Sequence, residues 1–296
     1  AEDAGQFADK RADGRADAAF CRTAAEAWGE TIKRDAVKKP IMVYVYGGDP
    51  HGMADSIEKW IEANDPKKSE DADPDAVPPG VLGMGYGDRR AAARVLARAC
   101  VKAIEQLVPR VYAAREWLRD VADACTDAGQ PIGWVSPSGF PTIQKRIKQK
   151  SVDEKVTTPN GRVQYKVRKD VEPLKLDKKE QRNGVAPNFT HSHDAAHLCE
   201  VVNAFWQDGP DPATCGRTRH VLHIHDALGC HAANMNTLHR LIREKFVAIY
   251  TERDPLPDLV EQTEAMGGDH PPTLPDLPER GSYDIRDAEG AIYLFS

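Results

Sequence analysis

The sequence RDAVKKPIMVYVYG, which runs from Arg34 to Gly47, decides how the chain is interpreted. Arg34, Lys38, Met42 and Tyr46 recur in steps of four, so a helix places them on one face, and Gly47 follows where backbone can approach a ligand. Two cations one turn apart suit a polyphosphate, because Arg is a planar fork of donors and Lys a point charge. A tyrosine beside a glycine suits a stacked base or sugar. Arg34 and Lys38 alone would favour a solvated basic face, but the longer pattern and two further motifs reverse that preference.

Pro40 stands inside this stretch. Proline in a helix interior removes a hydrogen bond and costs roughly 3 kcal/mol, whereas the first turn tolerates it. The sequence therefore predicts a helix that either starts near Lys38 or bends there.

Two later motifs carry the rest of the interpretation. The alternation of side chains from Val221 to Asp226 predicts a strand. With a tight turn expected at Gly229, Asp226 lies at the strand tip, where a carboxylate suits a hard cation such as Mg²⁺. An ordinary hairpin with an aspartate in its turn fits about as well. The motif APNFTHS, from Ala186 to Ser192, predicts a rigid turn and a polar run that opens an apolar-periodic helix.

Periodicity predicts the remaining elements. The expected helices are Ala18–Trp28, Ser56–Ala63, Asp88–Cys125 with a kink at Pro109, Ala195–Trp206 and Ala233–Tyr250. The third of these has an expected apolar stripe of Val95, Ala99, Ile104, Leu107, Val111 and Trp117. Strands are expected within Trp134–Pro141 and Val163–Val171, and an acidic, proline-rich loop lies near residues 64–80.

Composition constrains the class of protein. The 296 residues carry a net charge of −6, which argues against indiscriminate coating of nucleic acid. No run approaches the roughly 20 apolar residues of a membrane helix. The six cysteines show no C-x-x-C pair, which indicates reduced thiols in a cytoplasmic setting. Basic residues outnumber acids between Lys145 and Arg182, and that excess fits the phosphates of a nucleic acid as well as it fits a solvated loop.

The order of four motifs resembles the single-subunit RNA polymerases of bacteriophages and mitochondria. They are R-x-x-x-K-x-x-x-M-x-x-x-Y-G, then WVSPSGFP, APNFTHS and IHDA, and the resemblance extends from about Trp28 to Ser296. It implies an α+β, mainly helical fold, with right-hand polymerase fingers plus a partial palm whose β-hairpin carries a metal-binding aspartate. Residues 1–189 would be a fingers-like helical subdomain. Residues 190–296 would be the partial palm with the Asp hairpin and a C-terminal extension.

The resemblance also implies roles for individual residues. Arg34 and Lys38 would hold the triphosphate of the incoming nucleotide, with Met42 and Gly47 on the same nucleotide-binding helix. Tyr46 would help to select ribonucleotides, and His191 would recognise the ribose 2′-hydroxyl. Asp226 would be one of two carboxylates that hold two Mg²⁺ ions. The RNA 3′-hydroxyl would then attack the α-phosphate in line, and pyrophosphate would leave. The implied catalytic residues are thus Lys38, Tyr46, His191 and Asp226.

One departure concerns the second carboxylate. The family places it in an earlier motif of the form D-G-S, and nothing upstream of Arg34 resembles that motif. We therefore expect the chain to be inactive alone, and the other aspartate to come from a second polypeptide, as in a heterodimer, or from a missing segment. The expected partners are a DNA template, an RNA transcript and nucleoside triphosphates. The expected location is the cytoplasm of a bacterial host, with no membrane.

Three alternatives stay open. A DNA polymerase I-like enzyme shares R-x-x-x-K and Y-G, but usually has Phe at the position of Met42 and Glu at that of Ala227. A zinc-dependent hydrolase would use the H-x-H-D sequence from His191 to Asp194, although the spacing to the aspartate is wrong by one. A non-catalytic scaffold would need none of the implied site residues.

Overall fold

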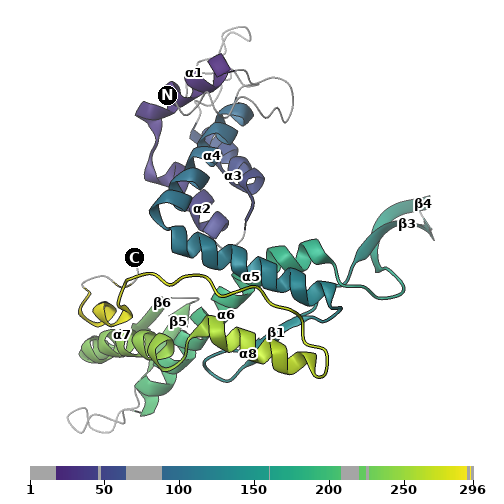
Figure 1. Ribbon diagram of the computed structural model, residues 1–296. Helices are drawn as coiled ribbons and strands as arrows, with labels where there is room; N and C mark the ends of the chain where they lie inside the picture. Colours follow the sequence, from purple (N-terminus) through teal and green to yellow (C-terminus); the bar gives the residue numbers. More distant parts are fainter. Residues whose placement is uncertain are drawn as a thin grey trace. The chain divides into compact units, whose positions relative to one another are not determined.

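The computed structural model describes residues 18–45, 48–64, 89–159, 161–207, 220–224, 227–291 and 294 (Figure 1). The chain divides into two compact units, Ala1–Arg115 and Glu116–Ser296, with the boundary inside helix α5 (Pro109–Asp127). Helices predominate, and the described strands form three antiparallel pairs, β1–β2, β3–β4 and β5–β6. The predicted class, α+β and mainly helical, is confirmed.

In the first unit, helices pack around one apolar core. The described helices before α5 are α1 (Ala18–Thr31), α2 (Arg34–Val45), α3 (Pro50–Asn64) and α4 (Arg89–Leu107). Helix α3 packs against both α2 and α4 (Figure 1). The largest fully buried side chains of this unit are those of Trp28, Met53, Ile57 and Ile61. The Trp28 indole satisfies its N–H inside the core by donating to the Ala92 carbonyl at 3.0 Å.

Helix α3 is longer than the predicted segment Ser56–Ala63. Asp49 precedes it, and its carboxylate accepts a hydrogen bond from the Gly52 N–H at 2.7 Å. Pro50 occupies the first helical position, where its missing N–H costs nothing. This start adds nearly two turns to the helix.

Helix α4 confirms only part of the predicted stripe, because Ile104 is buried and Val95 partly buried, whereas Ala99 is exposed. Its buried residues are Ala92, Ala93, Leu96, Ala97, Cys100 and Ile104. Leu107, a member of the predicted stripe, is 80% exposed. Alanine fits either side of a helix, so periodicity in this alanine-rich sequence did not fix the face. Packing against α3 and α1 does.

Helix α2 begins at Arg34, so the predicted start near Lys38 is wrong. Pro40 lies inside the helix and is buried. Its missing N–H leaves the helix without one bond, at a cost of about 3 kcal/mol. Burial of Ala36, Pro40 and Tyr44 against the core offsets that cost.

The second unit combines helices with the three strand pairs. After α5 come β1 (Ile132–Val135), β2 (Pro141–Gln144), β3 (Gln149–Thr158), β4 (Gly161–Asp170), α6 (Lys178–Gln207), β5 (Val221–Ile224), β6 (Ala227–Cys230), η4 (Ala232–Asn234), α7 (Met235–Glu252), α8 (Pro255–Gly267) and η5 (Ile285–Gly290). Pro109 begins α5, so the predicted kink is a break between two helices. One core joins α5, β1, α6 and α8, and a second lies mainly between α6 and α7.

Helix α6 runs through the motif that was predicted to be a turn. It starts at Lys178, two turns before Pro187, and Asp177 precedes it with its carboxylate 3.1 Å from the Glu180 N–H. Val185 and Phe189 are buried on either side of Pro187. This packing offsets the proline cost of roughly 3 kcal/mol, so the predicted rigid turn is wrong.

Strands β5 and β6 pair as predicted for a hairpin, but the turn is not at Gly229. Gly229 lies within β6 and pairs with Leu222. His225 and Asp226, which separate the two strands in the sequence, lie outside the described residues.

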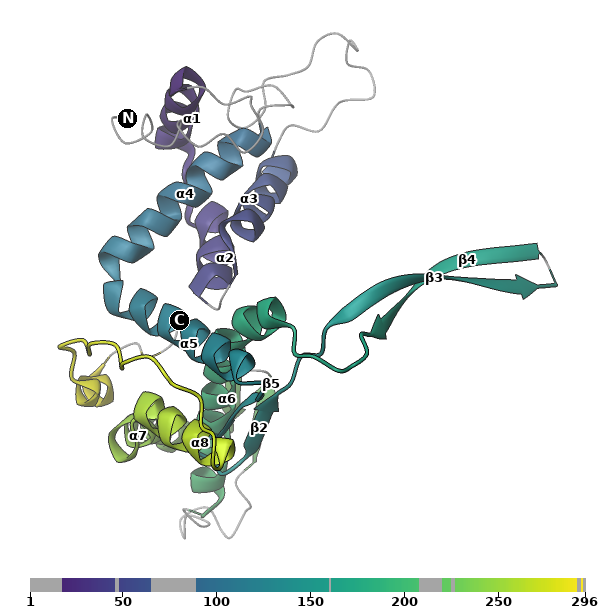
Figure 2. The ribbon, with the colours of Figure 1, turned by 45° about the vertical axis from the view of Figure 1, so that its right-hand side comes forward.

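The longest strand pair, β3–β4, projects away from α5 and α6 as a two-stranded arm (Figure 2). Side chains alternate between its faces. One face carries Val152, Val156, Val163, Tyr165 and Val167, together with the charged residues Lys150, Glu154 and Lys169. The opposite face carries Lys155, Arg162, Lys166 and Arg168, against the two acids Asp153 and Asp170. The segment is thus a ribbon with one partly apolar face, which also holds a Lys169–Glu154 ion pair, and one basic face. Strand β4 contains residues 163–170 of the predicted strand Val163–Val171, and β3 was not predicted.

Three further expectations concern the whole chain. The predicted division between residues 189 and 190 falls inside α6, and the assignment of the parts to fingers and palm stays a prediction. Cys100, Cys125, Cys199 and Cys230 are all free thiols, and the first two are buried. Among the described helices, none has both the length and the apolar character needed to cross a bilayer.

Candidate nucleotide and nucleic-acid site

Helix α2 presents the predicted phosphate-binding cations to solvent. Arg34, Lys38 and Met42 are exposed, whereas Ala36, Pro40 and Tyr44 are buried. Each step of four residues is about 6 Å along the helix axis. The buried positions fix the rotation of α2, and Arg34 and Lys38 therefore offer two positive charges one turn apart on its outer side.

The end of α2 is held by Arg115, a residue that the motif search missed. Its guanidinium is stacked over the Tyr44 ring, 4.4 Å from the ring centroid, and donates to the Gly48 carbonyl at 2.8 Å. Tyr46 and Gly47 lie outside the described residues, but Arg115 binds a residue on each side of them. Arg115 belongs to no repeat or spaced motif in the sequence. Only the structure distinguishes it, because an arginine that is 6% exposed is unusually buried.

Gly48 is required where α2 ends. Its N–H donates to the Val43 carbonyl at 2.8 Å. A Cβ atom at this position would lie 2.6 Å from that carbonyl oxygen and from the Val43 side chain, closer than side chains approach. A residue larger than glycine at position 48 would clash with the backbone and side chain of Val43.

Helix α6 exposes His191, whereas the side chains two positions before and two positions after it are buried. Phe189 and His193 are buried, and the Ser192 hydroxyl accepts a hydrogen bond from the Trp134 indole at 2.8 Å. The Ser192 hydroxyl in turn donates to the Phe189 carbonyl at 2.7 Å. These contacts fix the rotation of α6, so His191 lies on its outer side.

An aromatic stack supports this part of α6. The His193 ring lies 4.4 Å from the Phe189 ring and 6.4 Å from the Tyr250 ring, measured between centroids. Burial lowers the pKa of His193, and its Nδ1 lies 2.9 Å from the Phe189 carbonyl. Burial and the charge of Asp194 raise the pKa of Tyr250 to about 12. The stack is therefore neutral near pH 7 and serves packing.

The histidines of α6 point in different directions. His193 contacts the Phe189 carbonyl, whereas His197 Nε2 lies 2.8 Å from the Ile242 carbonyl on α7. Asp194 lies in the middle of α6, so the helix predicted to start at Ala195 in fact begins at Lys178. Over the described residues, no group of three His, Cys, Asp or Glu side chains could hold a metal ion. The described residues thus give the zinc alternative no support.

The chain matches the family model described as DNA-dependent RNA polymerase over residues 7–271. It belongs to this family. The match covers most of the sequence, including α2, α6 and the β5–β6 pair. The RNA polymerase interpretation is therefore favoured over a DNA polymerase I-like one, which the sequence alone had left open.

Relatives of the RNA polymerase family come from phages and plant organelles. The chain is 29% identical to the DNA-directed RNA polymerase of Pseudomonas phage phiKMV over 255 residues, which is 86% of this chain and 27% of that protein. It is 24% identical to DNA-directed RNA polymerase 3, chloroplastic, of Nicotiana sylvestris, over 90% of this chain and 24% of that protein. It is 26% identical to the mitochondrial DNA-directed RNA polymerase 1B of Nicotiana tabacum, over 90% of this chain and 23% of that protein. The chain spans about a quarter of the length of these relatives. Because they include organellar proteins, the predicted bacterial cytoplasm stays a prediction.

Proposed function

We propose that this chain is the nucleotide-binding part of a DNA-directed RNA polymerase, which transfers ribonucleotides to the 3′ end of a transcript on a DNA template. The observation that carries the proposal is the outer side of α2, where Arg34 and Lys38 lie one turn apart in a chain of this family. They would bind the triphosphate, Arg34 as a fork and Lys38 as a point charge.

The sugar and base would be held by residues beyond the cations. Tyr46 would stack near the base, within the segment whose two ends Arg115 binds. Met42 and Gly47 would line the same end of the helix. His191, exposed on α6, would hydrogen-bond to the 2′-hydroxyl and so distinguish a ribonucleotide from a deoxyribonucleotide.

Asp226 would contribute one carboxylate to a site for two Mg²⁺ ions. A carboxylate oxygen is a hard ligand of the kind Mg²⁺ prefers, so the donor chemistry fits. When bound, the ions would supply Lewis-acid stabilisation of the phosphate charge. The described residues form no complete metal site, and we propose that the second aspartate comes from another polypeptide or from a segment outside this sequence.

The basic face of the β3–β4 arm would bind nucleic acid. Its four cations, Lys155, Arg162, Lys166 and Arg168, share one face of a ribbon whose strands are exposed along most of their length. A two-stranded ribbon fits a groove of duplex DNA, and each neutralised phosphate makes the affinity more sensitive to salt.

The test uses the complete polymerase, with the polypeptide or segment that supplies the second aspartate. Lys38→Met removes the proposed triphosphate contact, and Lys39→Met is the matched control, because Lys39 is also exposed on α2 and lies one position away. A charged hydrogen bond contributes about 1.5–3 kcal/mol, so kcat/KM for nucleotide incorporation falls about 10- to 150-fold in Lys38→Met. Equal effects of the two substitutions would refute the assignment.

The alternative scaffold function is tested with Asp226→Asn. If Asp226 is catalytic, the assembled complex that carries Asp226→Asn loses transcription while it still binds DNA. Transcription retained at the wild-type rate would support the scaffold.

A further inference from the structure

A buried pair of glutamines joins strand β2 to helix α6. Gln144, at the end of β2, is 4% exposed, and Gln181, in the first turn of α6, is fully buried. The Gln144 side-chain amide donates to the Gln181 carbonyl at 2.7 Å, and the Gln181 side-chain amide donates to the Gln144 carbonyl at 2.9 Å. Each glutamine therefore binds the backbone of the other.

The remaining amide oxygens extend this link in two directions. Gln181 Oε1 accepts from the Arg146 N–H at 3.0 Å, toward the β3–β4 arm. Gln144 Oε1 accepts from the Asn188 side-chain amide at 2.6 Å, further along α6. Each side-chain oxygen and nitrogen of the two glutamines thus has a partner, and loss of either side chain would leave buried polar groups unpaired.

Both legs of the arm are attached at this place. The Asp177 N–H donates to the Arg146 carbonyl, and the Lys148 N–H donates to the Lys175 carbonyl, both at 2.8 Å. The Val171 N–H donates to the Lys148 carbonyl at 2.9 Å. The chain that enters β3 and the chain that leaves β4 are thereby bonded to each other and to the start of α6.

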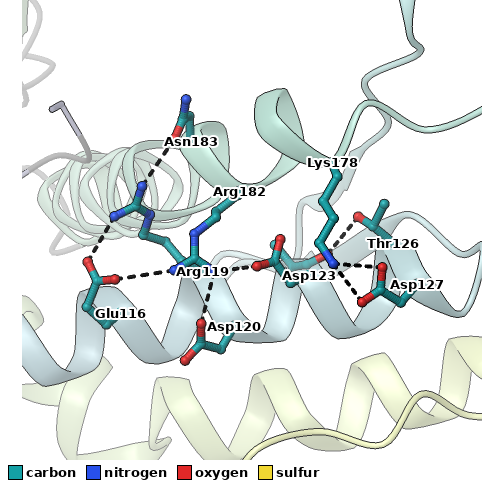
Figure 3. A network of polar contacts seen from close by, with 10 residues as sticks. Glu116, Arg119, Asp120, Asp123, Thr126, Asp127, Lys178, Arg182 and Asn183 are labelled. Carbon is teal, nitrogen blue, oxygen red and sulfur yellow. Dashed lines mark hydrogen bonds and ion pairs between the residues drawn. The ribbon is translucent and has the colours of Figure 1, made fainter.

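The other side of α6 is fixed to α5 by ion pairs (Figure 3). Arg182, the neighbour of Gln181, pairs with Asp120 at 2.9 Å, with Glu116 at 3.4 Å and with Asp123. Lys178 pairs with Asp127 at 2.7 Å. The first turns of α6 are therefore bonded to α5 on one side and to the base of the arm on the other.

His191 lies close to the end of this link. It follows Asn188 by three residues, so the two side chains are neighbours on the helix surface. Gln181 is ten residues before His191, or about 15 Å along the axis of a single continuous helix.

We propose that Gln144 and Gln181 are positioning residues that couple the nucleic-acid-binding arm to ribose recognition at His191. The proposal rests on the proposed function. It states that the position of the arm on bound nucleic acid affects the placement of His191, because the glutamine pair makes the base of the arm and the start of α6 one rigid connection.

The test measures sugar discrimination in the complete polymerase, as the ratio of kcat/KM for a ribonucleoside triphosphate to that for the matching deoxyribonucleoside triphosphate. Gln181→Met keeps the side-chain volume and removes the hydrogen bonds. Gln149→Met is the matched control, because Gln149 is exposed on β3 and bonds within the arm, to Asp170. We expect the ratio to fall at least about fivefold in Gln181→Met and to stay unchanged in the control. An unchanged ratio in a folded Gln181→Met enzyme overturns the proposal. A purely structural defect would lower kcat/KM for both nucleotides together and so leave their ratio unchanged.

A second arm of the experiment tests the coupling itself. The pair of substitutions Lys166→Gln and Arg168→Gln weakens the basic face without touching the glutamines. If the arm and His191 are coupled, the double substitution changes the sugar ratio in the wild-type background but has little further effect on that ratio in the Gln181→Met background. Equal effects in both backgrounds overturn the coupling.

Two measures keep these outcomes separate from other failures. Should Gln181→Met fail to fold, as judged by circular dichroism, Gln144→Met replaces it, because it removes the Gln144 side-chain bonds and leaves the bond from the Arg146 N–H to Gln181 in place. The expected and contrary results are the same. Lys38→Met distinguishes the two proposals: the proposed function fails when that variant behaves like Lys39→Met, whereas the coupling fails when Lys38→Met acts as expected and the sugar ratio does not change.

Discussion

Replacement of Arg115 by methionine tests how the end of α2 is held. The hydrogen bond to the Gly48 carbonyl, at 2.8 Å, is charge-assisted and contributes about 1.5–3 kcal/mol. The stacking of the guanidinium over Tyr44 contributes about 0.5–2 kcal/mol. Methionine fills much of the same volume, so a cavity adds little. We expect the free energy of unfolding of the first unit to fall by about 2–5 kcal/mol.

Hydrogen exchange of the full chain, followed by mass spectrometry, measures this loss peptide by peptide. Amides of α2 and α3 exchange faster in Arg115→Met, while amides of α7 and α8 keep their wild-type rates. Arg110→Met is the control, because Arg110 lies on the same helix and is exposed. In the complete polymerase, Arg115→Met also raises the KM for nucleotide, because Tyr46 lies between the two residues that Arg115 binds. Wild-type exchange in α2 would refute the reasoning.

Three further changes follow from the second unit. Gly184→Ala places a Cβ 3.2 Å from the Gln144 Oε1 atom. In a helix, alanine is usually more stabilising than glycine by roughly 1 kcal/mol, but because of this close contact urea unfolding of Gly184→Ala should show a loss of stability. A gain in stability would contradict the close contact. Arg182→Met should cost about 1 kcal/mol at low salt, and the difference from wild type should shrink in 1 M NaCl, because its ion pairs are partly exposed; an effect independent of salt would contradict their electrostatic origin. Burial lowers the pKa of His193 and His197 below 6.5, so the unfolded chain binds protons at a higher pH than the folded chain does, and thermal stability should fall as the pH is lowered from 7.5 to 5.5. The substitution His193→Gln should reduce that loss of stability. A pH–stability curve parallel to that of the wild type would exclude His193 as a source of the loss.

Local patterns predicted the elements that local interactions control. Apolar periodicity predicted a helix over Ala233–Tyr250, and α7 confirms it to within two residues at each end. Proline chemistry marked Pro109 as a point of interruption, although the predicted kink is a break between two helices. The continuation of α6 through Pro187 was not predictable in this way, because contacts of Val185 and Phe189 with distant parts of the chain offset the local cost of proline.

The candidate site shows the same division. Steps of four residues predicted that Arg34, Lys38 and Met42 share a helix face, and α2 confirms it. Arg115 and Gln181 contact residues that lie 67 and 37 positions away in the sequence, and such contacts leave no periodic signal. The sequence therefore indicated which residues α2 exposes on one face, and it missed the buried residues that hold neighbouring segments in place.

The two-faced arm has a consequence for how this protein can diversify. Its bonds to the body are concentrated at the base, between residues 146–148 and 171–177, whereas the strands beyond pair mainly with each other. The strands beyond the base can thus be replaced by a different hairpin, with new side chains on the basic face, while the hydrophobic core stays unaltered. Replacing the strands beyond the base should therefore change the surface of the arm without a need to redesign the rest of the fold.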